Sequence, residues 1–226
     1  MKDLIIFGTG KIADVIYYYA TNECNIKVVA FTVDDNYTER DTFHDLPVIA
    51  FSNLEKSYPP DQYDMFIAIG YQDLNRLRQL KYNEAKAKGY HLISIIPPNA
   101  NLPANVKAGD NCFIMPPAII HPFVEIGNNT FVWNGAMIGH HTSIGDHCWL
   151  TSMASISGAV NVGDGSFFAV NATVGHDVTI GNNCFIGANT LVTKNLLDKQ
   201  VVIQSSSKVI RLNSFEFLRF SKFSSV

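Results

Sequence analysis

The sequence carries little charge, no cluster of basic residues and no long apolar run near its start. Lys, Arg, Asp and Glu make up only 16% of the 226 residues, and the formal net charge is −3. Without a block of Lys and Arg the chain cannot neutralise a phosphate backbone, which argues against nucleic acid as a partner. The first apolar stretch, residues 4–7, is far too short for a signal sequence or a membrane span. We therefore expect a cytoplasmic protein without a transmembrane segment.

What the sequence does contain is a repeat. Hydrophobic residues make up 47% of the chain, which is enough to bury a core. From Ile96 to Val192 an apolar residue recurs at every sixth position, and a small or β-branched residue follows four positions after each. A longer period is superimposed, because a glycine recurs every eighteen residues at positions 109, 127, 145, 163 and 181. Neither the helical period of 3.6 nor the strand period of 2 produces a repeat of six.

A period of six nested within eighteen predicts coils with three short flat faces. Each sixth residue would point into a triangular prism, and glycine at one corner per coil suits a turn with unusual backbone angles. Stacked coils would pair their strands in parallel, about 4.8 Å apart. Residues 96–192 are therefore predicted to form a parallel β-helix, followed by a C-terminal segment over 193–226.

Cysteine is scarce, and its spacing fits this prism. Cys112, Cys148 and Cys184 would lie in one column two coils apart. That separation is roughly 9.6 Å at the strand spacing, which is beyond disulfide reach. We predict small buried thiols in a reducing compartment, with Cys24 standing alone.

Residues 1–95 are organised differently. "DLIIFGTGKIADVIYYYA" is a short apolar strand, a glycine turn and a helix, and Gly8-x-Gly10-x-x-Ala13 is the pattern in which a helix N-terminus receives phosphate oxygens. A second strand ends in Asp34 and Asp35, where such folds meet a ribose or base. Further strands alternate with a helix around residues 72–88, which predicts a small Rossmann-like α/β domain with a parallel sheet. A merely structural glycine turn is the alternative.

An aromatic residue also recurs every eighteen positions, directly after the small inward residue. Strand alternation would point this column outward: Phe113, Phe131, Trp149, Phe167 and Phe185. A stripe of this size facing water is unusual. We expect a subunit interface to cover it, with packing against the chain's own C-terminal segment as the alternative.

Histidines cluster in "MIGHHTSIGDH", residues 137–147. His176 follows His140 by thirty-six residues, so it would lie at the same corner two coils on, about 10 Å away. His141 and His147 are expected to be exposed or packed at a subunit contact, and His121 to be structural. Catalysis by a bound metal is not expected, because His141 and His147 fall on different faces and no acidic residue is placed to orient them.

The pairing of "GTGKIA" with an unbroken hexapeptide prism resembles the sugar O-/N-acyltransferases of the sialic-acid and bacillosamine biosynthetic type, with relatives that act on perosamine. "FIAIGYQDLNRLRQL", "AMIGHHTSIGD" and "SSSKVIR" also look like segments of that family. The resemblance implies a left-handed prism, a homotrimer with active sites between prisms, and a role in lipopolysaccharide O-antigen biosynthesis. It also implies acetyl-CoA as co-substrate, without a metal.

The same resemblance assigns roles to individual residues. "NGAMIG" places His140 where the family has its catalytic base, which would take a proton from the sugar amine as it attacks acetyl-CoA. Family members carry Asp or Glu beside this histidine, whereas here the neighbour is His141. Binding of the nucleotide-linked sugar is assigned to residues of the α/β domain: Gly8, Thr9, Gly10, Lys11, Asp34, Asp35 and Gly70. Binding of acetyl-CoA is assigned to Trp149, Gly158, Val170, His176, Ala188 and Lys208.

The expected activity is therefore N-acetylation of a nucleotide-linked amino-deoxy sugar, with a 4-amino-4,6-dideoxy sugar as the acceptor. Two alternatives remain at this point. The same base would serve O-acetylation of a sugar hydroxyl. A non-catalytic hexapeptide scaffold or nucleotide-sugar-binding subunit is favoured by the missing carboxylate at His141. The Phe-rich end of the chain, residues 212–226, is expected to pack on the trimer or to touch a membrane surface.

Overall fold

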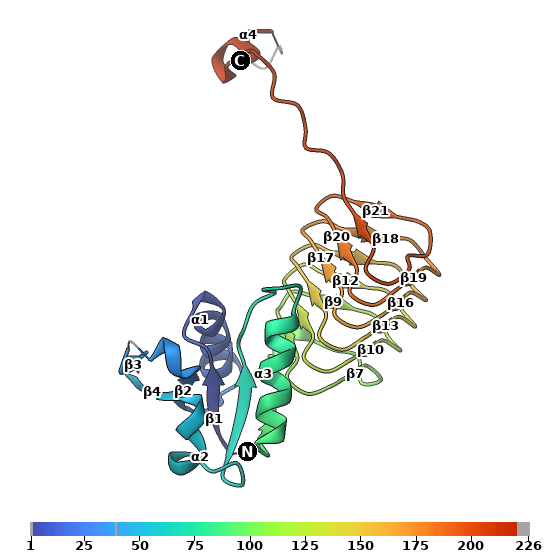
Figure 1. Ribbon diagram of the computed structural model, residues 1–226. Coiled ribbons are helices and arrows are strands. Elements are labelled where there is room, and N and C mark those ends of the chain that lie inside the picture. Colours follow the sequence, from blue (N-terminus) through green and yellow to red (C-terminus); the bar gives the residue numbers. More distant parts are fainter. Residues whose placement is uncertain (1, 39, 221–226) are drawn as a thin grey trace.

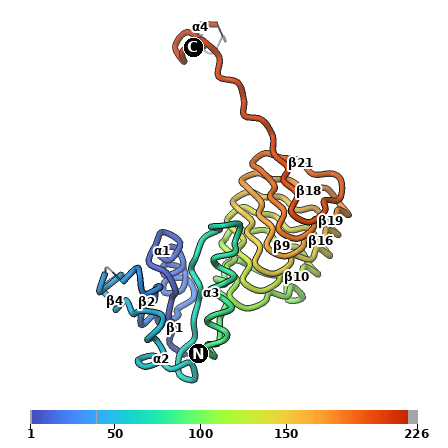
Figure 2. The backbone as a smooth tube through the Cα atoms, in the orientation of Figure 1, coloured from blue at the N-terminus to red at the C-terminus, as the bar shows by residue number. Residues whose placement is uncertain are grey.

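The structure is a computed structural model that describes residues 2–38 and 40–220. An α/β unit formed by the N-terminal part lies beside a stack of coils, and the C-terminal segment runs away from the far end of the stack (Figure 1). The backbone trace shows that each coil is one turn of the chain stacked on the preceding turn (Figure 2).

The α/β unit is built on a six-stranded sheet in the order β3-β4-β2-β1-β5-β6. Its strands are β1 (Asp3–Phe7), β2 (Val28–Val33), β3 (Thr42–Phe43), β4 (Leu46–Ala50), β5 (Tyr63–Ile67) and β6 (His91–Leu92). All neighbouring strands pair in parallel except β3 and β4, which form an antiparallel hairpin at one edge. The predicted parallel α/β domain is thus confirmed, whereas its edge hairpin was not predicted.

The helices of this unit cover both faces of the sheet. They are α1 (Lys11–Tyr18), which continues as a π-helical turn (Tyr19–Glu23), α2 (Leu54–Ser57) and α3 (Arg76–Ala87), with short 3-10 turns at Asp35–Tyr37 and Phe51–Asn53. A further 3-10 turn, Pro98–Ala100, belongs to the prism, because Ala100 is part of the prism core. One core joins α1 to one face of the sheet, and a second core joins α2 and α3 to the other. Helix α3 begins four residues later than the predicted 72–88, because residues 73–75 have positive φ angles that an α-helix cannot contain.

The coils form a left-handed parallel β-helix with three flat faces. Face 1 consists of β7 (Lys107–Ala108), β10 (Glu125–Ile126), β13 (Ser143–Ile144), β16 (Asn161–Val162) and β19 (Thr179–Ile180). Face 2 consists of β8 (Phe113–Ile114), β11 (Phe131–Val132), β14 (Trp149–Leu150), β17 (Phe167–Phe168), β20 (Phe185–Ile186) and β22 (Val201–Val202). Face 3 consists of β9 (Ile119–Ile120), β12 (Met137–Ile138), β15 (Ser155–Ile156), β18 (Thr173–Val174) and β21 (Leu191–Val192).

The predicted eighteen-residue register is confirmed strand by strand. Ile126 pairs with Ile144, and Ile144 pairs with Val162 on the next coil. The inward residues of all three faces form one continuous buried core. The column of cysteines lies in it as predicted, and burial raises the pKa of the Cys112 and Cys148 thiols to about 12, so these thiols stay protonated and unreactive.

The recurrent glycines are required for a different reason from the one predicted. None of the five glycines of the eighteen-residue series has a positive φ. A Cβ on Gly145 would instead lie 2.5 Å from Asp164 Oδ1, and one on Gly163 would lie 2.7 Å from the backbone nitrogen of Asn182. Close stacking of coils excludes a side chain there. The positive φ angles fall two residues later, as at His147 and Asn183.

The expectation that a subunit interface covers the aromatic column is wrong. The α/β unit of the same chain covers it, because its apolar residues share one buried core with Phe113, Phe131, Trp149 and Phe167. Trp149 is 2% exposed and stacks on Phe131, with ring centroids 4.9 Å apart and an interplanar angle of 10°. The ring of Tyr71, which follows β5, packs against Trp149 with ring centroids 5.4 Å apart. The column is therefore part of the interface between the two units.

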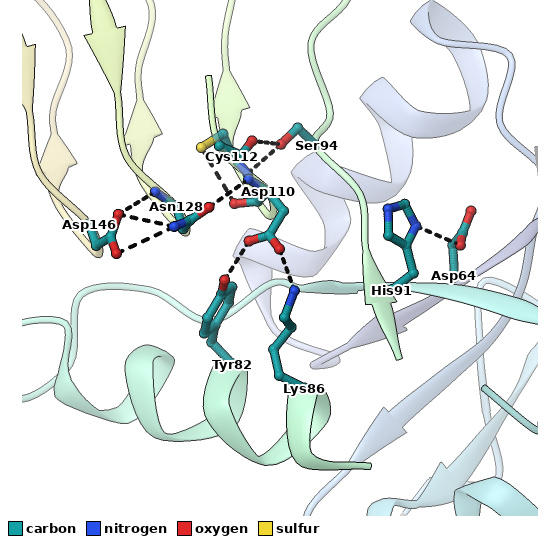
Figure 3. Close-up of polar contacts among 10 residues, drawn as sticks. Asp64, Tyr82, Lys86, His91, Ser94, Asp110, Cys112, Asn128 and Asp146 are labelled. Atoms are coloured by element: carbon teal, nitrogen blue, oxygen red, sulfur yellow. Dashed lines mark hydrogen bonds and ion pairs between the residues drawn. The ribbon is translucent and has the colours of Figure 1, made fainter. Parts of the chain in front are cut away.

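Polar contacts also connect α3 to the first coils (Figure 3). Lys86 Nζ lies 2.6 Å from one carboxylate oxygen of Asp110, and the Tyr82 hydroxyl donates to the other at 2.5 Å. The backbone nitrogen of Asp110 donates to Asn128 Oδ1, and that of Asn128 donates to Asp146 Oδ1. This ladder of Asn and Asp side chains continues along the same corner of the prism and holds successive coils together.

The expectation that His147 is exposed or lies at a subunit contact is wrong, because the residue is buried between the two units. Its ring packs against that of Tyr82, with ring centroids 5.3 Å apart, and Asn129 Nδ2 donates to its Nδ1 at 2.8 Å. Burial lowers the pKa of the His147 imidazole, since the site disfavours the charged form.

This lowered pKa predicts loss of stability in acid. The unfolded chain binds the proton at a higher pH than the folded chain, so the stabilisation is complete above the unfolded pKa of roughly 6.5 and decreases below it. Urea unfolding at about pH 8 and about pH 5.5 should therefore show a larger loss of unfolding free energy for the wild type than for His147→Gln, whose amide does not titrate in this range. An equal loss in both proteins would contradict the assignment.

The C-terminal segment leaves the prism after β22 and ends in α4 (Ser214–Phe220), which lies away from both units (Figure 1). Its aromatic residues are exposed, with Phe215 and Phe220 each at 77%. The Phe-rich end of the chain was expected to pack on the trimer or to touch a membrane surface, and its residues 221–226 lie outside the described residues. No helix in the described part of the chain is long and apolar enough to span a membrane.

Candidate functional site

The glycine turn after β1 borders a cavity of about 510 Å³ at the carboxyl ends of the central strands. Gly8 has a φ of 117°, which favours glycine, and a Cβ there would lie 3.0 Å from the carbonyl oxygen of Ala68. Gly10 precedes α1 and has open space where a Cβ would be. The turn therefore brings backbone and the start of α1 to the cavity, the arrangement that receives phosphate oxygens.

Six of the seven predicted sugar-nucleotide residues line this cavity: Gly8, Thr9, Gly10, Lys11, Asp34 and Gly70. The seventh, Asp35, is not brought there. Its carboxylate accepts a 2.6 Å hydrogen bond from the Ser52 hydroxyl, which holds the pKa of Asp35 below its ordinary value. Residues that the sequence reasoning missed complete the lining: Phe7, Ile12, Val33, Tyr37, Ala68, Ile69, Gln72 and Leu77.

Asp34 is fixed by a lysine that the sequence analysis did not single out. Lys81 Nζ lies 2.6 Å from Asp34 Oδ1 and 2.8 Å from Glu84 Oε2. Burial alone would lower the pKa of Lys81, but these hydrogen bonds outweigh it and raise the pKa, so Lys81 is cationic. The pair with Glu84 has helical i,i+3 spacing, whereas the contact with Asp34 depends on the fold.

His140 lies at the corner between faces 3 and 1, on the segment that joins β12 to β13. It is exposed, and its Nδ1 lies 3.1 Å from Nδ1 of His141. His141 has a φ of 58° and stacks on Phe123, with ring centroids 4.7 Å apart. His141, at the position where the resemblance implies a carboxylate, is thus in hydrogen-bonding contact with His140 and is itself held by an aromatic ring.

His176 occupies the same corner two coils further on, as predicted. Its ring centroid is 6.4 Å from that of His140, nearer than the 10 Å separation expected from the coil spacing. A Cβ on Gly158, at the intermediate level, would lie 2.9 Å from His140 Nε2. Gly158 therefore leaves room for the His140 ring itself.

The remaining residues predicted to bind acetyl-CoA fall into three places. Val170 and Ala188 are exposed at the corner between faces 2 and 3, and Ala188 lines a cavity of about 620 Å³ formed with residues 203–207. Lys208 is exposed on the C-terminal segment. The indole of Trp149 is buried by the α/β unit, so a contact of this residue with acetyl-CoA stays a prediction for its backbone.

No group of three or more His, Cys, Asp and Glu residues in the described ranges is arranged to hold a metal ion. His141 contacts His140, whereas His147 is directed to Asn129 at another corner. The imidazoles at the His140 corner can accept and donate protons.

Two family models match different parts of the chain. The PglD N-terminal domain matches residues 3–85, and the six-repeat bacterial transferase hexapeptide matches residues 105–140 and 159–194. No curated protein matches the chain in sequence.

Solved structures match both units together. A histidine-to-asparagine variant of perosamine N-acetyltransferase from Caulobacter crescentus, in complex with CoA and GDP-perosamine, is 27% identical with a TM-score of 0.82, over 90% of this chain and 94% of that one. The acetyltransferase domain of PglB from Neisseria gonorrhoeae FA1090 is 22% identical with a TM-score of 0.79, over 89% and 96% of the two chains. WeeI from Acinetobacter baumannii AYE is 18% identical with a TM-score of 0.75, over 90% and 97%.

The last two similarities support the fold alone, whereas the two family models and the first structure agree on more than the fold. Together they cover the glycine turn, the α/β sheet and the hexapeptide prism. The chain therefore belongs to the hexapeptide-repeat sugar acyltransferases that carry a PglD-type N-terminal domain.

Proposed function

We propose that this enzyme transfers an acetyl group from acetyl-CoA to the amine of a nucleotide-linked amino sugar, with a 4-amino-4,6-dideoxy sugar as the acceptor. The observation that carries the proposal is the cavity lined by residues 7–12 in a chain that also presents His140 on a hexapeptide prism. The similar enzyme from Caulobacter crescentus, a perosamine N-acetyltransferase, was solved with CoA and GDP-perosamine. The free thiols of the chain fit a reducing compartment, so we place the reaction in the cytoplasm.

His140 acts as the general base in this proposal. If His140 donates its Nδ1 proton to Nδ1 of His141, its Nε2 is left unprotonated and able to accept a proton. The opposite direction of this hydrogen bond would leave the proton on Nε2 and remove the base. His141, held against Phe123, thus takes the orienting role that the resemblance implies for a carboxylate.

In the proposed reaction, His140 carries one proton from the sugar amine to the leaving thiolate. His140 takes a proton from the sugar amine while the nitrogen attacks the thioester carbonyl of acetyl-CoA. The nitrogen–carbon bond forms, the carbon–sulfur bond breaks, and the proton held by His140 passes to the departing CoA thiolate. The side chain of His176 lies beside His140 and forms part of the wall of this corner.

We also propose a homotrimer. The aromatic column does not support it, because the α/β unit of the same chain covers that column, but the positions of the cavity and of His140 do. Gly70 lines the sugar-nucleotide cavity, and the next residue, Tyr71, packs on face 2. Arg78, which donates to the Gly70 carbonyl, also donates to the His147 carbonyl at the corner between faces 1 and 2. His140 lies at the corner opposite face 2, so the cavity and the base of one chain lie on different sides of the prism. A sugar held by one copy would meet His140 of a neighbouring copy.

Exposed apolar residues on face 3 and at its corners support such a contact between copies. They are Ile119, Phe123, Met153, Val170 and Leu191, each between 48% and 64% exposed. Mixing a His140→Ala chain with a Gly10→Val chain tests the arrangement. Activity above that of either variant alone supports a shared site, whereas a stable monomer by sedimentation would contradict it.

Gly10→Val is expected to weaken binding of the nucleotide-linked sugar and to spare acetyl-CoA. The space where a Cβ would be is open, so valine fits without displacing the backbone but narrows the approach to the cavity. Calorimetric titration of both ligands provides the measurement. Equal loss of both affinities would mean that the variant is misfolded or that the cavity is not the sugar-nucleotide site.

A further inference from the structure

Arg78 is fully buried on α3, although the sequence offers it no obvious acidic partner. All of its hydrogen bonds in the described part of the chain go to uncharged oxygens: Gly70 O at 3.0 Å, Asn75 Oδ1 at 3.0 Å, Asn129 O at 3.3 Å, His147 O at 2.9 Å and Cys148 O at 3.2 Å. The guanidinium carbon also lies 4.8 Å from the Phe131 ring centroid and 5.1 Å from that of Trp149. Burial lowers the pKa of Arg78 to about 9, which still leaves it charged at neutral pH. Burying a charge without a counter-ion is costly and calls for an explanation.

The turn that precedes α3 is unfavourable in its own right. Asp73, Leu74 and Asn75 have φ angles of 49°, 49° and 66°, a left-handed run that L-residues avoid. Such a conformation persists only where its surroundings hold it. Asn75 is 1% exposed, donates from Nδ2 to Gly165 O at 3.1 Å on the prism, and accepts from Arg78 Nη1 through Oδ1.

The same turn connects directly to the sugar-nucleotide cavity. Gly70 and Gln72, which immediately precede it, both line the cavity. Arg78 Nη1 holds the carbonyl of Gly70, while Nη2 of the same guanidinium holds the carbonyls of His147 and Cys148 on the prism. One side chain thus connects a wall of the cavity to the β-helix.

We propose that Arg78 is a positioning residue for nucleotide binding: together with Asn75 it holds the left-handed turn against the prism and so fixes the cavity wall at Gly70–Gln72. The inference rests on the proposed function, because it assigns that cavity to the nucleotide. It means that the prism, in addition to presenting His140, determines the shape of the site in the α/β unit.

The test compares two variants with a matched control in the full-length protein. Arg78→Met keeps the length and apolar contacts of the side chain but removes its donors. Asn75→Gly keeps access to positive φ but removes both side-chain hydrogen bonds, and it serves if Arg78→Met does not fold. Lys86→Met is the control, because it removes an ion pair to the prism from the same helix without touching Gly70. The probes are UDP, dTDP and GDP, together with acetyl-CoA, each titrated calorimetrically below the unfolding temperature of every variant.

For the nucleoside diphosphate that binds the wild type, Arg78→Met and Asn75→Gly should raise Kd by about tenfold or more, as expected when buried hydrogen-bond partners are removed. Their Kd for acetyl-CoA, and both Kd values of Lys86→Met, should stay within about twofold of the wild type, the range in which no interaction has been lost. Unchanged nucleotide affinity in folded Arg78→Met or Asn75→Gly overturns the inference, as does a parallel loss of acetyl-CoA affinity. If the wild type binds none of the three nucleotides, the proposed function of the cavity fails and the inference fails with it.

Discussion

His140→Ala is expected to fold, assemble and bind both substrates, yet to lose about 10²–10⁴-fold in kcat, the contribution typical of a general base. The loss should appear in kcat more than in KM, because a proton acceptor acts in the transition state rather than in ground-state binding. The ring is exposed, and a Cβ remains after the substitution, so little packing is lost. Steady-state kinetics with both substrates varied is the measurement.

His176→Ala is the matched comparison, since it lies at the same corner two coils further on. Its effect should be milder if His176 only lines the wall beside the base. Should His176→Ala abolish turnover while His140→Ala preserves it, the base must be assigned two coils along the prism.

Trp149→Ala is expected to reduce the free energy of unfolding by about 3–5 kcal/mol, the usual loss for a large buried aromatic side chain. The substitution removes the stack on Phe131, the contact with Tyr71 and the ring over which Arg78 lies. Denaturant unfolding measures the change. Because the interface lies within one chain, the loss should not depend on protein concentration.

Leu197→Ala is the control for this prediction. Leu197 is 75% exposed, and removal of an exposed side chain usually changes stability by no more than about 0.5 kcal/mol. If Trp149→Ala were as mild as Leu197→Ala, or if its effect disappeared at high protein concentration, the aromatic column would belong to an interface between copies after all.

The prism could be predicted from the sequence because its in-and-out pattern is local and repeats without interruption. The column of His140, Gly158 and His176 followed from the same spacing, and the structure places all three at one corner. The sequence could not provide the distance between the two rings, because their side-chain torsions are independent of the repeat. The glycine turn was equally readable, since a strand, two glycines and a helix are all adjacent in sequence.

The contacts between the two units could not be predicted from the repeat. The period of eighteen showed that the aromatic residues point outward, but it carries no information on which surface covers them. His147 was misplaced for the same reason, since its burial depends on Tyr82 from a distant helix. One signal was present: Arg78 shares the helical face of Tyr82 and Ala85, which are core residues, and a charged residue at such a position indicates a specific set of partners.

The most direct test of the proposed activity is an acetyl-transfer assay with UDP-, dTDP- and GDP-linked amino sugars, with products identified by mass spectrometry. We predict that one acetyl group is added to the sugar of at least one substrate, that the product resists hydroxylamine as an amide does, and that His140→Ala forms it far more slowly. A product cleaved by hydroxylamine would instead be an O-acetyl ester. Sugars that bind without any transfer from acetyl-CoA would contradict the proposal and leave the protein a nucleotide-sugar-binding scaffold.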